Sequence, residues 1–597
     1  MTPEFKKKLK ETGIFSPFDI KFADIISSFA EHNTDILALT AAMLSWTTTV
    51  ESNVCLNINE WIGKKVPGGI IKCPNSVKLW RDALKNTPSV GCPGEVVPLI
   101  LDQNDKIYLH KFWTYEKIIA EQLLKRSRII LKPHKKQIET FLQSLGKKHK
   151  IDDQDKAVII SLLKPLSIIS GGPGTGKSTV TGKIVSILKS VPDKGSTRII
   201  MTAPTGKAVA RLTQMVSGFD KHCNIEAVTL HRLLEADNYG KVRKHHDNPI
   251  EADVLIIDEV SMVDIGLMAK LLDATQNIKR IIMLGDKSQL SSVEAGTVFG
   301  DICNSVTIGQ YSKNLSEKIN EFIEVKDIIS HKEEHKNYPP LTDCIVELSK
   351  NYRFKTNSGI WKISTLIKNG DGIQAFEILK LNSVFTDISL LNISSSFSVS
   401  KKLKKITDSY FKPCLRIEQA EIALKKMSEF RILCAIRYGD QGVKKINQEI
   451  EKLLEINPVN GWYHGRPIII SRNDYTIGLF TGDSGVALND KKSGDLKVYF
   501  HSQTGEIRSF LPIQIPDHET AWAITTHKSQ GSEYNHVIMI LPLKFSQLLG
   551  RELLYTGITR AKDKSEIWAA DDIFIETCNN KINRTSGLMD KLSLPPV

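Results

Sequence analysis

One stretch of small residues ends in a lysine and a hydroxyl side chain, a combination suited to binding phosphate groups. It reads Gly171-Gly172-Pro173-Gly174-Thr175-Gly176-Lys177-Ser178, and Thr179 follows. Its glycines let backbone N–H groups converge on phosphate oxygens. Lys177 can reach the β- and γ-phosphates of a nucleoside triphosphate, and the hydroxyl of Ser178 can ligate Mg²⁺. We therefore expect this loop, together with Thr179, to bind ATP with Mg²⁺.

Two acids downstream could complete a hydrolytic site. The apolar run from Val254 to Ile257 ends in Asp258 and Glu259. Such a pair is weak evidence alone. After a phosphate loop it predicts that Asp258 holds Mg²⁺ and that Glu259 positions and polarises the attacking water. Upstream, Gln154 is a candidate to recognise the adenine edge, with an ordinary surface glutamine as the alternative.

Further blocks of polar and basic residues follow in a fixed order. They are Ala203-Pro204-Thr205-Gly206-Lys207-Ala208, Thr229-Leu230-His231-Arg232-Leu233-Leu234, Leu284-Gly285-Asp286-Lys287-Ser288-Gln289-Leu290, Lys350-Asn351-Tyr352-Arg353, Thr525-Thr526-His527-Lys528-Ser529-Gln530-Gly531-Ser532-Glu533 and Tyr555-Thr556-Gly557-Ile558-Thr559-Arg560-Ala561. In order and spacing, these blocks resemble those of superfamily 1 helicases. Because phosphate loops also serve kinases and GTPases, the last two blocks are what favour a motor over another phosphate-loop protein.

The resemblance implies roles on both sides of a nucleotide cleft. Gln289 would sense the γ-phosphate and relay its presence to a DNA groove. Arg353 and Arg560, expected from the second domain, would stabilise charge on the transferring phosphoryl group. Taken singly, each arginine is more often a surface or structural residue. The catalytic set implied by the motifs is Lys177, Asp258, Glu259, Gln289, Arg353 and Arg560.

The same blocks supply candidates for gripping DNA. Hydroxyl, basic and backbone N–H groups suit contacts with a phosphate backbone. Solvated loop residues are the alternative for each of them. Aromatic stacking platforms are also expected in a single-strand groove, but the sequence does not single them out. The DNA-binding candidates are Thr205, Lys207, His231, Thr526, His527 and Lys528.

Positioning these residues requires two parallel sheets. Apolar runs at 166–170, 198–202, 254–257 and 280–284 each precede a turn or helix, which predicts strands joined by crossovers. We expect an α/β fold with two RecA-like parallel-sheet motor domains, a small β-barrel insertion and a separate, mainly helical N-terminal domain. The expected bounds are 1–130 for the N-terminal domain, 150–345 for the first motor domain, 346–454 plus 519–597 for the second, and 455–518 for the barrel. The polar stretch 305–342 is predicted to be a linker or a mobile insertion.

Bulk composition narrows the class of protein. A chain of 597 residues with 41% hydrophobic residues is long and apolar enough to form several cores. The net charge of +13 favours a polyanionic partner, although many soluble proteins are this basic. The nine cysteines are dispersed without metal-binding spacing, which is typical of reduced thiols. No apolar run approaches the ~20 residues that would span a bilayer, so we expect a cytoplasmic protein with no membrane partner.

A closer resemblance covers residues from about 98 to the end. The blocks that carry it include Asp258-Glu259-Val260-Ser261-Met262-Val263-Asp264, Ser291-Ser292-Val293-Glu294-Ala295-Gly296, Trp462-Tyr463-His464-Gly465-Arg466-Pro467 and Arg584-Thr585-Ser586-Gly587-Leu588. With the phosphate loop, they are similar to those of the RecD family, the alpha subunits of bacterial RecBCD complexes (exodeoxyribonuclease V). The first 97 residues resemble this family only loosely.

The resemblance implies an ATP-dependent 5′-to-3′ motor on single-stranded DNA. Such a motor works in a heterotrimer with RecB and RecC subunits, which unwinds and degrades double-strand ends for recombinational repair. The nuclease activity is expected in RecB, and the N-terminal region is expected to contact RecC. Two alternatives remain at this point: a stand-alone superfamily 1 helicase, and a largely structural subunit whose ATPase is vestigial.

Overall fold

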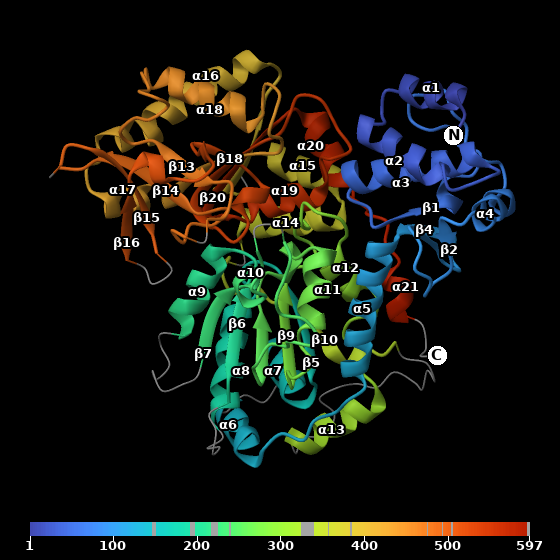
Figure 1. Cartoon of the computed structure of the whole chain (residues 1–597). Coiled ribbons are helices and arrows are strands. Elements are labelled where there is room, and N and C mark those ends of the chain that lie inside the picture. Colours follow the sequence, from blue (N-terminus) through green and yellow to red (C-terminus); the bar gives the residue numbers. More distant parts are fainter. Residues whose placement is uncertain are drawn as a thin grey trace.

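The computed structural model describes the chain except residues 146–150, 191–196, 217–224, 238–239, 324–338, 356, 382–384, 475, 492, 503–505 and 594–597. Figure 1 shows two α/β domains, one above the other in this view, with a β-sheet insertion at one side and the N-terminal unit at the other. Among the described residues, no helix combines the length and the apolar character needed to cross a membrane. The mixed α/β architecture with two parallel sheets confirms the predicted fold class.

The first motor domain is built on a six-stranded parallel sheet in the order β10-β5-β9-β8-β6-β7. Its strands are β5 (Leu166–Gly171), β6 (Ile199–Ala203), β7 (Ile225–Thr229), β8 (Val254–Ile257), β9 (Arg280–Gly285) and β10 (Ile345–Leu348). Strands β5, β6 and β8 are buried along their whole length, as expected for a parallel sheet covered on both faces, whereas the edge strand β7 exposes Glu226. The helices are α6 (Lys135–Leu145), α7 (Asp153–Leu163), α8 (Lys177–Lys189), α9 (Gly206–Val216), α10 (Leu230–Leu233), α11 (Ile265–Asp273), α12 (Val298–Asn304) and α13 (Lys313–Ile323).

Two features of this domain differ from the expectations drawn from the sequence. Strand β10 pairs in parallel with β5, so the first sheet extends to Leu348, beyond the boundary expected at 345. The polar stretch 305–342 contains α13, whose Leu315 and Ile319 are buried in the same core as β5. This part is a packed helix rather than a linker, and residues 324–338 lie outside the described part of the chain.

The second motor domain has a five-stranded parallel sheet in the order β11-β20-β19-β12-β18. Its strands are β11 (Ile388–Asn392), β12 (Phe430–Cys434), β18 (Ala523–Thr525), β19 (Tyr534–Ile540) and β20 (Ala561–Ala569). The helices are α14 (Gly359–Asn369), α15 (Gly372–Lys380), α16 (Ser396–Ile406), α17 (Ala420–Glu429), α18 (Val443–Leu453), α19 (Arg551–Ile558) and α20 (Asp571–Asn579). Most residues singled out from the sequence follow strands, at the edge where parallel strands end, whereas Gln154 lies on α7 and Arg560 lies between α19 and β20.

The insertion between β12 and β18 is an antiparallel sheet in the order β16-β15-β14-β13-β17. Its strands are β13 (Pro467–Ile470), β14 (Ser484–Asn489), β15 (Leu496–His501), β16 (Ile507–Phe510) and β17 (His518–Thr520). A small core that includes Ile468, Val498 and Phe500 packs on one face. Strands β16 and β17 are the edges and do not pair with each other among the described residues, so the expected closed barrel is not confirmed.

The N-terminal unit has its own core but is not separate from the motor. Its elements are α1 (Pro3–Glu11), α2 (Pro17–Ser27), α3 (Thr34–Val50), α4 (Val77–Lys85), β1 (Cys55–Asn57), β2 (Val90–Gly91), β3 (Leu99–Leu101), β4 (Lys106–Leu109) and α5 (His110–Ser127). Helix α5 packs on α11, and its Ile119 and Leu123 share one core with the first sheet. The same core includes Cys55, Ile100 and Tyr108 of β1, β3 and β4, so the unit expected at 1–130 is not separate from the motor.

The chain ends in a segment that returns across the molecule. We call residues 580–593 the C-terminal strap; it includes α21 (Leu588–Ser593). One guanidinium nitrogen of Arg584 donates to the carbonyls of Ser292, Glu294 and Gly296 at 2.7, 3.0 and 2.9 Å. Lys591 donates to the buried carboxylate of Glu116 on α5 at 2.5 Å. The strap thus connects the end of the second motor domain with the first domain and with α5.

Candidate active site

The phosphate loop connects β5 to α8, the strand–loop–helix context that the sequence predicted. Gly174 and Gly176 adopt φ values of +80° and +87°, which L side chains rarely adopt. A Cβ atom on Gly176 would lie 2.2 Å from the side-chain nitrogen of Gln154, so the position also lacks space. The Nζ atom of Lys177 lies over the loop and donates to the carbonyls of Gly171 and Gly172 at 2.6 and 3.2 Å. The loop therefore presents a cation and the start of a helix to the same place.

The two acids follow β8, as expected. Glu259 has a left-handed φ of +53°, and its backbone N–H donates to Asp258 at 2.8 Å. Burial and the neighbouring Glu259 carboxylate raise the pKa of Asp258, while Lys177 opposes that shift. The hydroxyl of Ser178 and the carboxylate of Asp258 are oxygen ligands of the kind that Mg²⁺ prefers, so the residues present fit this ion.

Arg353 lies on the first domain, not on the second as the sequence analysis expected. It follows β10, whose end packs against the phosphate loop. The Asn351 side chain donates to the carbonyl of Pro173 at 2.8 Å, and the Tyr352 N–H donates to the Gly174 carbonyl at the same distance. The guanidinium of Arg353 then forms an ion pair with Glu533 of the second domain. Arg353 thus faces the cleft from the side of the loop.

Gln289 and Arg560 both lie close to the contact between the two domains. The Gln289 side chain donates to Asp286 at 3.1 Å, and the hydroxyl of Tyr555 donates to the same carboxylate at 3.0 Å. Arg560 comes from the second domain, is 3% exposed, and donates through Nε to the carbonyl of Thr556 at 3.1 Å. Burial lowers the pKa of Arg560, and the carboxylate charge of Glu259 opposes that shift. The block that contains Gln289 is therefore hydrogen-bonded to the second domain through Asp286 and Tyr555.

A cavity of about 590 Å³ adjoins the phosphate loop on the side of α7. Gln154 lines it and donates to the carbonyl of Thr175 at 3.1 Å, so Gln154 is a buried partner of the loop rather than a surface residue. Tyr352 also lines this cavity and is 49% exposed, with the ammonium of Lys350 5.0 Å from its ring centroid. Sequence reasoning missed Tyr352, although an aromatic residue beside Arg353 is a signal for a base-stacking partner.

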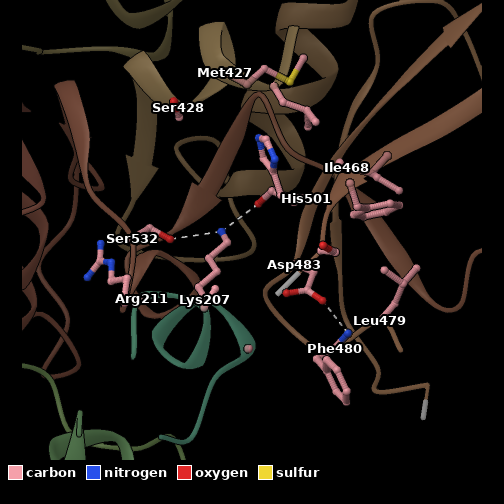
Figure 2. Close-up of a pocket in the computed structure, with 18 of the residues that line it drawn as sticks. Lys207, Arg211, Met427, Ser428, Ile468, Leu479, Phe480, Asp483, His501 and Ser532 are labelled. Carbon is pink, nitrogen blue, oxygen red and sulfur yellow. Dashed lines mark hydrogen bonds between the residues drawn. The ribbon is translucent and has the colours of Figure 1, made fainter. Parts of the chain in front are cut away.

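The six DNA-binding candidates do not form one exposed set. Lys207 on α9 donates to Ser484 of the insertion at 3.0 Å and to Ser532 at 3.2 Å (Figure 2). Lys528 forms an ion pair with Glu519 at 2.8 Å. Burial lowers the pKa of His231, and it lowers the pKa of His527 to about 4, which keeps His527 neutral near pH 7.

Thr205 and Thr526 differ most among these candidates. Thr205 approaches the second domain, because a Cβ atom on Gly531 would lie 3.2 Å from its hydroxyl oxygen. Thr526 is 0% exposed, and its hydroxyl lies 3.5 Å from the Cys434 carbonyl oxygen. The expected direct contact of Thr526 with DNA is therefore corrected: its side chain packs inside the second domain, where it supports the loop that carries His527 and Lys528.

Three protein-family models match the chain. They describe the N-terminal domain of RecBCD enzyme subunit RecD (residues 11–108), an AAA domain (154–295) and a UvrD-like helicase C-terminal domain (520–567). The RecBCD enzyme subunit RecD of Haemophilus influenzae is 31% identical over 97% of this chain and 98% of its own length. This chain belongs to the RecD family. The match at 11–108 extends the family likeness through the N-terminal unit, which the sequence analysis had matched only loosely.

Other relatives agree. The RecBCD enzyme subunit RecD of Buchnera aphidicola from Schizaphis graminum is 33% identical over 85% of this chain and 87% of its own. The ATP-dependent RecD2 DNA helicase of Deinococcus radiodurans is 25% identical over 67% of this chain and 46% of its own. Among solved structures, Bacteroides Pif1 bound to ssDNA covers 71% of this chain at 18% identity, with a TM-score of 0.37 that is too low to add to the fold argument.

Proposed function

We propose that this chain is the ATP-driven 5′-to-3′ DNA helicase subunit of a RecBCD-type helicase and nuclease that processes double-strand breaks. The observation that carries the proposal is the convergence of the loop lysine, the two acids and the arginines on one cleft, in a chain that aligns along nearly its whole length with RecD subunits. In this function Lys177, Arg353 and Arg560 stabilise the charge of the transferring phosphoryl group, and Glu259 orients water. Ser178 and Asp258 hold Mg²⁺.

Gln289 can couple the presence of the γ-phosphate in this cleft to the second domain. Asp286 and Gln289 follow β9 of the first sheet, while Tyr555 and Thr556 lie on α19 of the second domain. The Leu290 N–H donates to Thr556 at 2.8 Å, and the Gln530 side chain donates to the Leu290 carbonyl at 2.6 Å. A change at the γ-phosphate is therefore passed to the block that contains His527 and Lys528. Opening and closing of the cleft moves Thr205 and Lys207 relative to these residues, which is the motion that a two-grip motor needs.

The partners we propose are RecB and RecC subunits and the single-stranded part of a double-strand end. The N-terminal unit offers a docking face for a subunit. Phe18, Ile25 and Phe29, on α2 and just beyond its end, are 66%, 46% and 54% exposed. Their spacing of seven and four residues places them on one side of the helix. An apolar stripe of this kind is typical of a surface that a protein partner covers.

The decisive experiment compares duplexes with a 5′ or a 3′ single-stranded tail. The purified chain, alone and with RecB and RecC, is expected to hydrolyse ATP when single-stranded DNA is added and to unwind only the 5′-tailed duplex. DNA affinity is expected to fall steeply as salt rises, because backbone contacts release counterions. Preference for the 3′ tail contradicts the proposed polarity. ATP hydrolysis that ignores DNA contradicts the proposed motor.

A further inference from the structure

A large cavity lies beside the nucleotide cleft, and of its lining residues the function proposed above uses only Lys207. It lies between α9, α17 and the insertion sheet and has a volume of about 1110 Å³. Figure 2 shows its walls: Lys207 and Arg211 come from α9, Ser428 from α17, and Phe480, Asp483 and His501 from the insertion.

The walls of this cavity are strongly cationic. Six lysine or arginine side chains line it, against the two carboxylates of Asp483 and Glu533: Lys207, Arg211, Arg232, Arg431, Arg508 and Lys562. A concave surface of one sign concentrates ions of the opposite sign. Asp483 is turned toward its own backbone, where it accepts the Phe480 N–H at 2.8 Å. The chemistry of the cavity therefore suits a small anion.

Glu533 connects the inner end of the cavity with the nucleotide cleft. This residue lines the cavity and also forms the ion pair with Arg353. Its carboxylate lies 3.9 Å from a guanidinium nitrogen of Arg211 and 3.9 Å from Nζ of Lys562, both of which line the cavity. The charge of Glu533 also acts on Arg560. One carboxylate thus separates the arginines of the cleft from the cations of the cavity.

The opposite side of the cleft is where the base is expected to bind, at Gln154 and Tyr352. ADP that remains bound after hydrolysis would occupy that side. The phosphate released from the γ-position would then need another way out. The cavity begins at the arginine cluster that surrounds this position.

We propose that the cavity is the exit path for inorganic phosphate and that Glu533 is its gate. The inference rests on the ATP hydrolysis proposed above. With Glu533 paired to Arg353 and Arg211, its negative charge closes the inner end to another anion. When these arginines turn toward the new phosphate, the gate loses its partners and moves aside. The phosphate then passes outward along Arg211, Lys562 and Arg508.

Two variants test the path without altering a residue of the catalytic set. Ser428→Trp places a large side chain in the cavity, with Ser428→Ala as its control. Arg508→Glu reverses a charge on the exposed strand β16, with Arg508→Lys as its control. ATP cleavage is followed by rapid quenching in a single turnover, and phosphate release by a fluorescent phosphate-binding protein. We expect both variants to leave the cleavage rate unchanged and to slow phosphate release roughly five-fold or more, while both controls release phosphate normally.

The outcomes separate this proposal from the function on which it rests. If the unaltered protein cleaves no ATP in the presence of single-stranded DNA, the proposed function fails before the path is tested. If it does cleave ATP but release in both variants stays as fast as in the controls, the path is wrong. Loss of DNA affinity with unchanged release would instead make the cavity part of the DNA groove and would also overturn the exit path.

Discussion

The ammonium group of Lys177 is held directly over the carbonyls of the phosphate loop, and this placement leads to our first prediction. Lys177→Gln removes the charge while nearly keeping the side-chain length. We expect ATP turnover to fall by about 100-fold or more, because a preorganised cation at the phosphates is lost. Single-strand-stimulated ATPase measures the effect, and circular dichroism checks the fold. A folded variant with near-normal turnover would show that this lysine does not serve the reaction.

Asp258 and Glu259 are adjacent in the chain but have different proposed tasks, which two isosteric variants can separate. Glu259→Gln keeps the size of the side chain and loses its basicity, so we expect ATP binding to persist while hydrolysis slows by about 100- to 10,000-fold. Asp258→Asn should weaken Mg²⁺-dependent nucleotide binding instead. Titration with a fluorescent ATP analogue, with and without Mg²⁺, distinguishes the two. Equal losses of affinity would contradict the division of roles.

The sequence indicated which strands precede three of the proposed catalytic residues, because phosphate chemistry constrains both residue type and spacing. Lys177, Asp258 and Gln289 lie where the blocks placed them. Arg353 was assigned to the wrong domain, since a block carries no information about which sheet its preceding strand joins. Thr526 was misjudged for a similar reason: a hydroxyl in a polar block gives no sign of the direction in which it points.

At the scale of elements, the exposed stripe of α2 predicts a contact with a partner subunit. The double variant Phe18→Asp with Ile25→Asp should disrupt a contact between this stripe and a partner subunit. We expect the affinity for RecB and RecC to fall about 30-fold, as for two residues at the centre of an interface. Co-purification and analytical ultracentrifugation measure the association. ATPase of the isolated chain should be unaffected, because α2 lies outside the motor core.

A matched control for the stripe exists on the second motor domain. Phe397 on α16 is 79% exposed, so Phe397→Asp removes a comparable exposed ring at a distant place. We expect this variant to assemble normally. Assembly that is equally reduced in both variants would indicate a general loss of solubility. Assembly that survives the α2 variants would place the docking surface elsewhere.

Strand positions followed from the sequence more closely than strand pairings did. The strand β8 spans the apolar run that the sequence indicated, because a buried parallel strand has a continuous apolar pattern. Strand β10 is interrupted by Glu347, and its place beside β5 depends on a long-range pairing. The insertion shows the same limit. The sequence predicted a small β-barrel at 455–518, but closure into a barrel depends on whether the edges β16 and β17 meet, and among the described residues they do not pair.

At the scale of the whole molecule, the C-terminal strap predicts a stability effect far from the strap itself. Arg584→Ala would leave the carbonyls of Ser292, Glu294 and Gly296 without their shared donor. We expect a loss of about 1–3 kcal/mol in the free energy of unfolding, because three carbonyls lose hydrogen bonds from a charged donor. Thermal denaturation checks it, and Arg584→Lys should recover part of the loss. An unchanged melting temperature would mean that water replaces the guanidinium.

Integration of the N-terminal unit with the motor could not be foreseen from local patterns. Helix α5 looks like the end of a separate unit in the sequence, and the core of α1 to β4 supports that view. Its Ile119 and Leu123 nevertheless complete the first motor core, and its buried Glu116 pairs with Lys591 from the other end of the chain. Removing residues 1–130 would therefore delete part of the first motor core instead of releasing a separate domain.

The C-terminal strap also gives the two motor domains a second mechanical connection. The two motor domains are joined once by the segment that follows β10 and a second time by residues 580–593, which return from α20 to the first domain. A hinge with a single connection can swing widely, whereas a hinge spanned twice is confined to a narrow arc. Each cycle of ATP would then produce a short, repeatable displacement, and force from the DNA would be shared between the covalent linker and the non-covalent contacts of the strap.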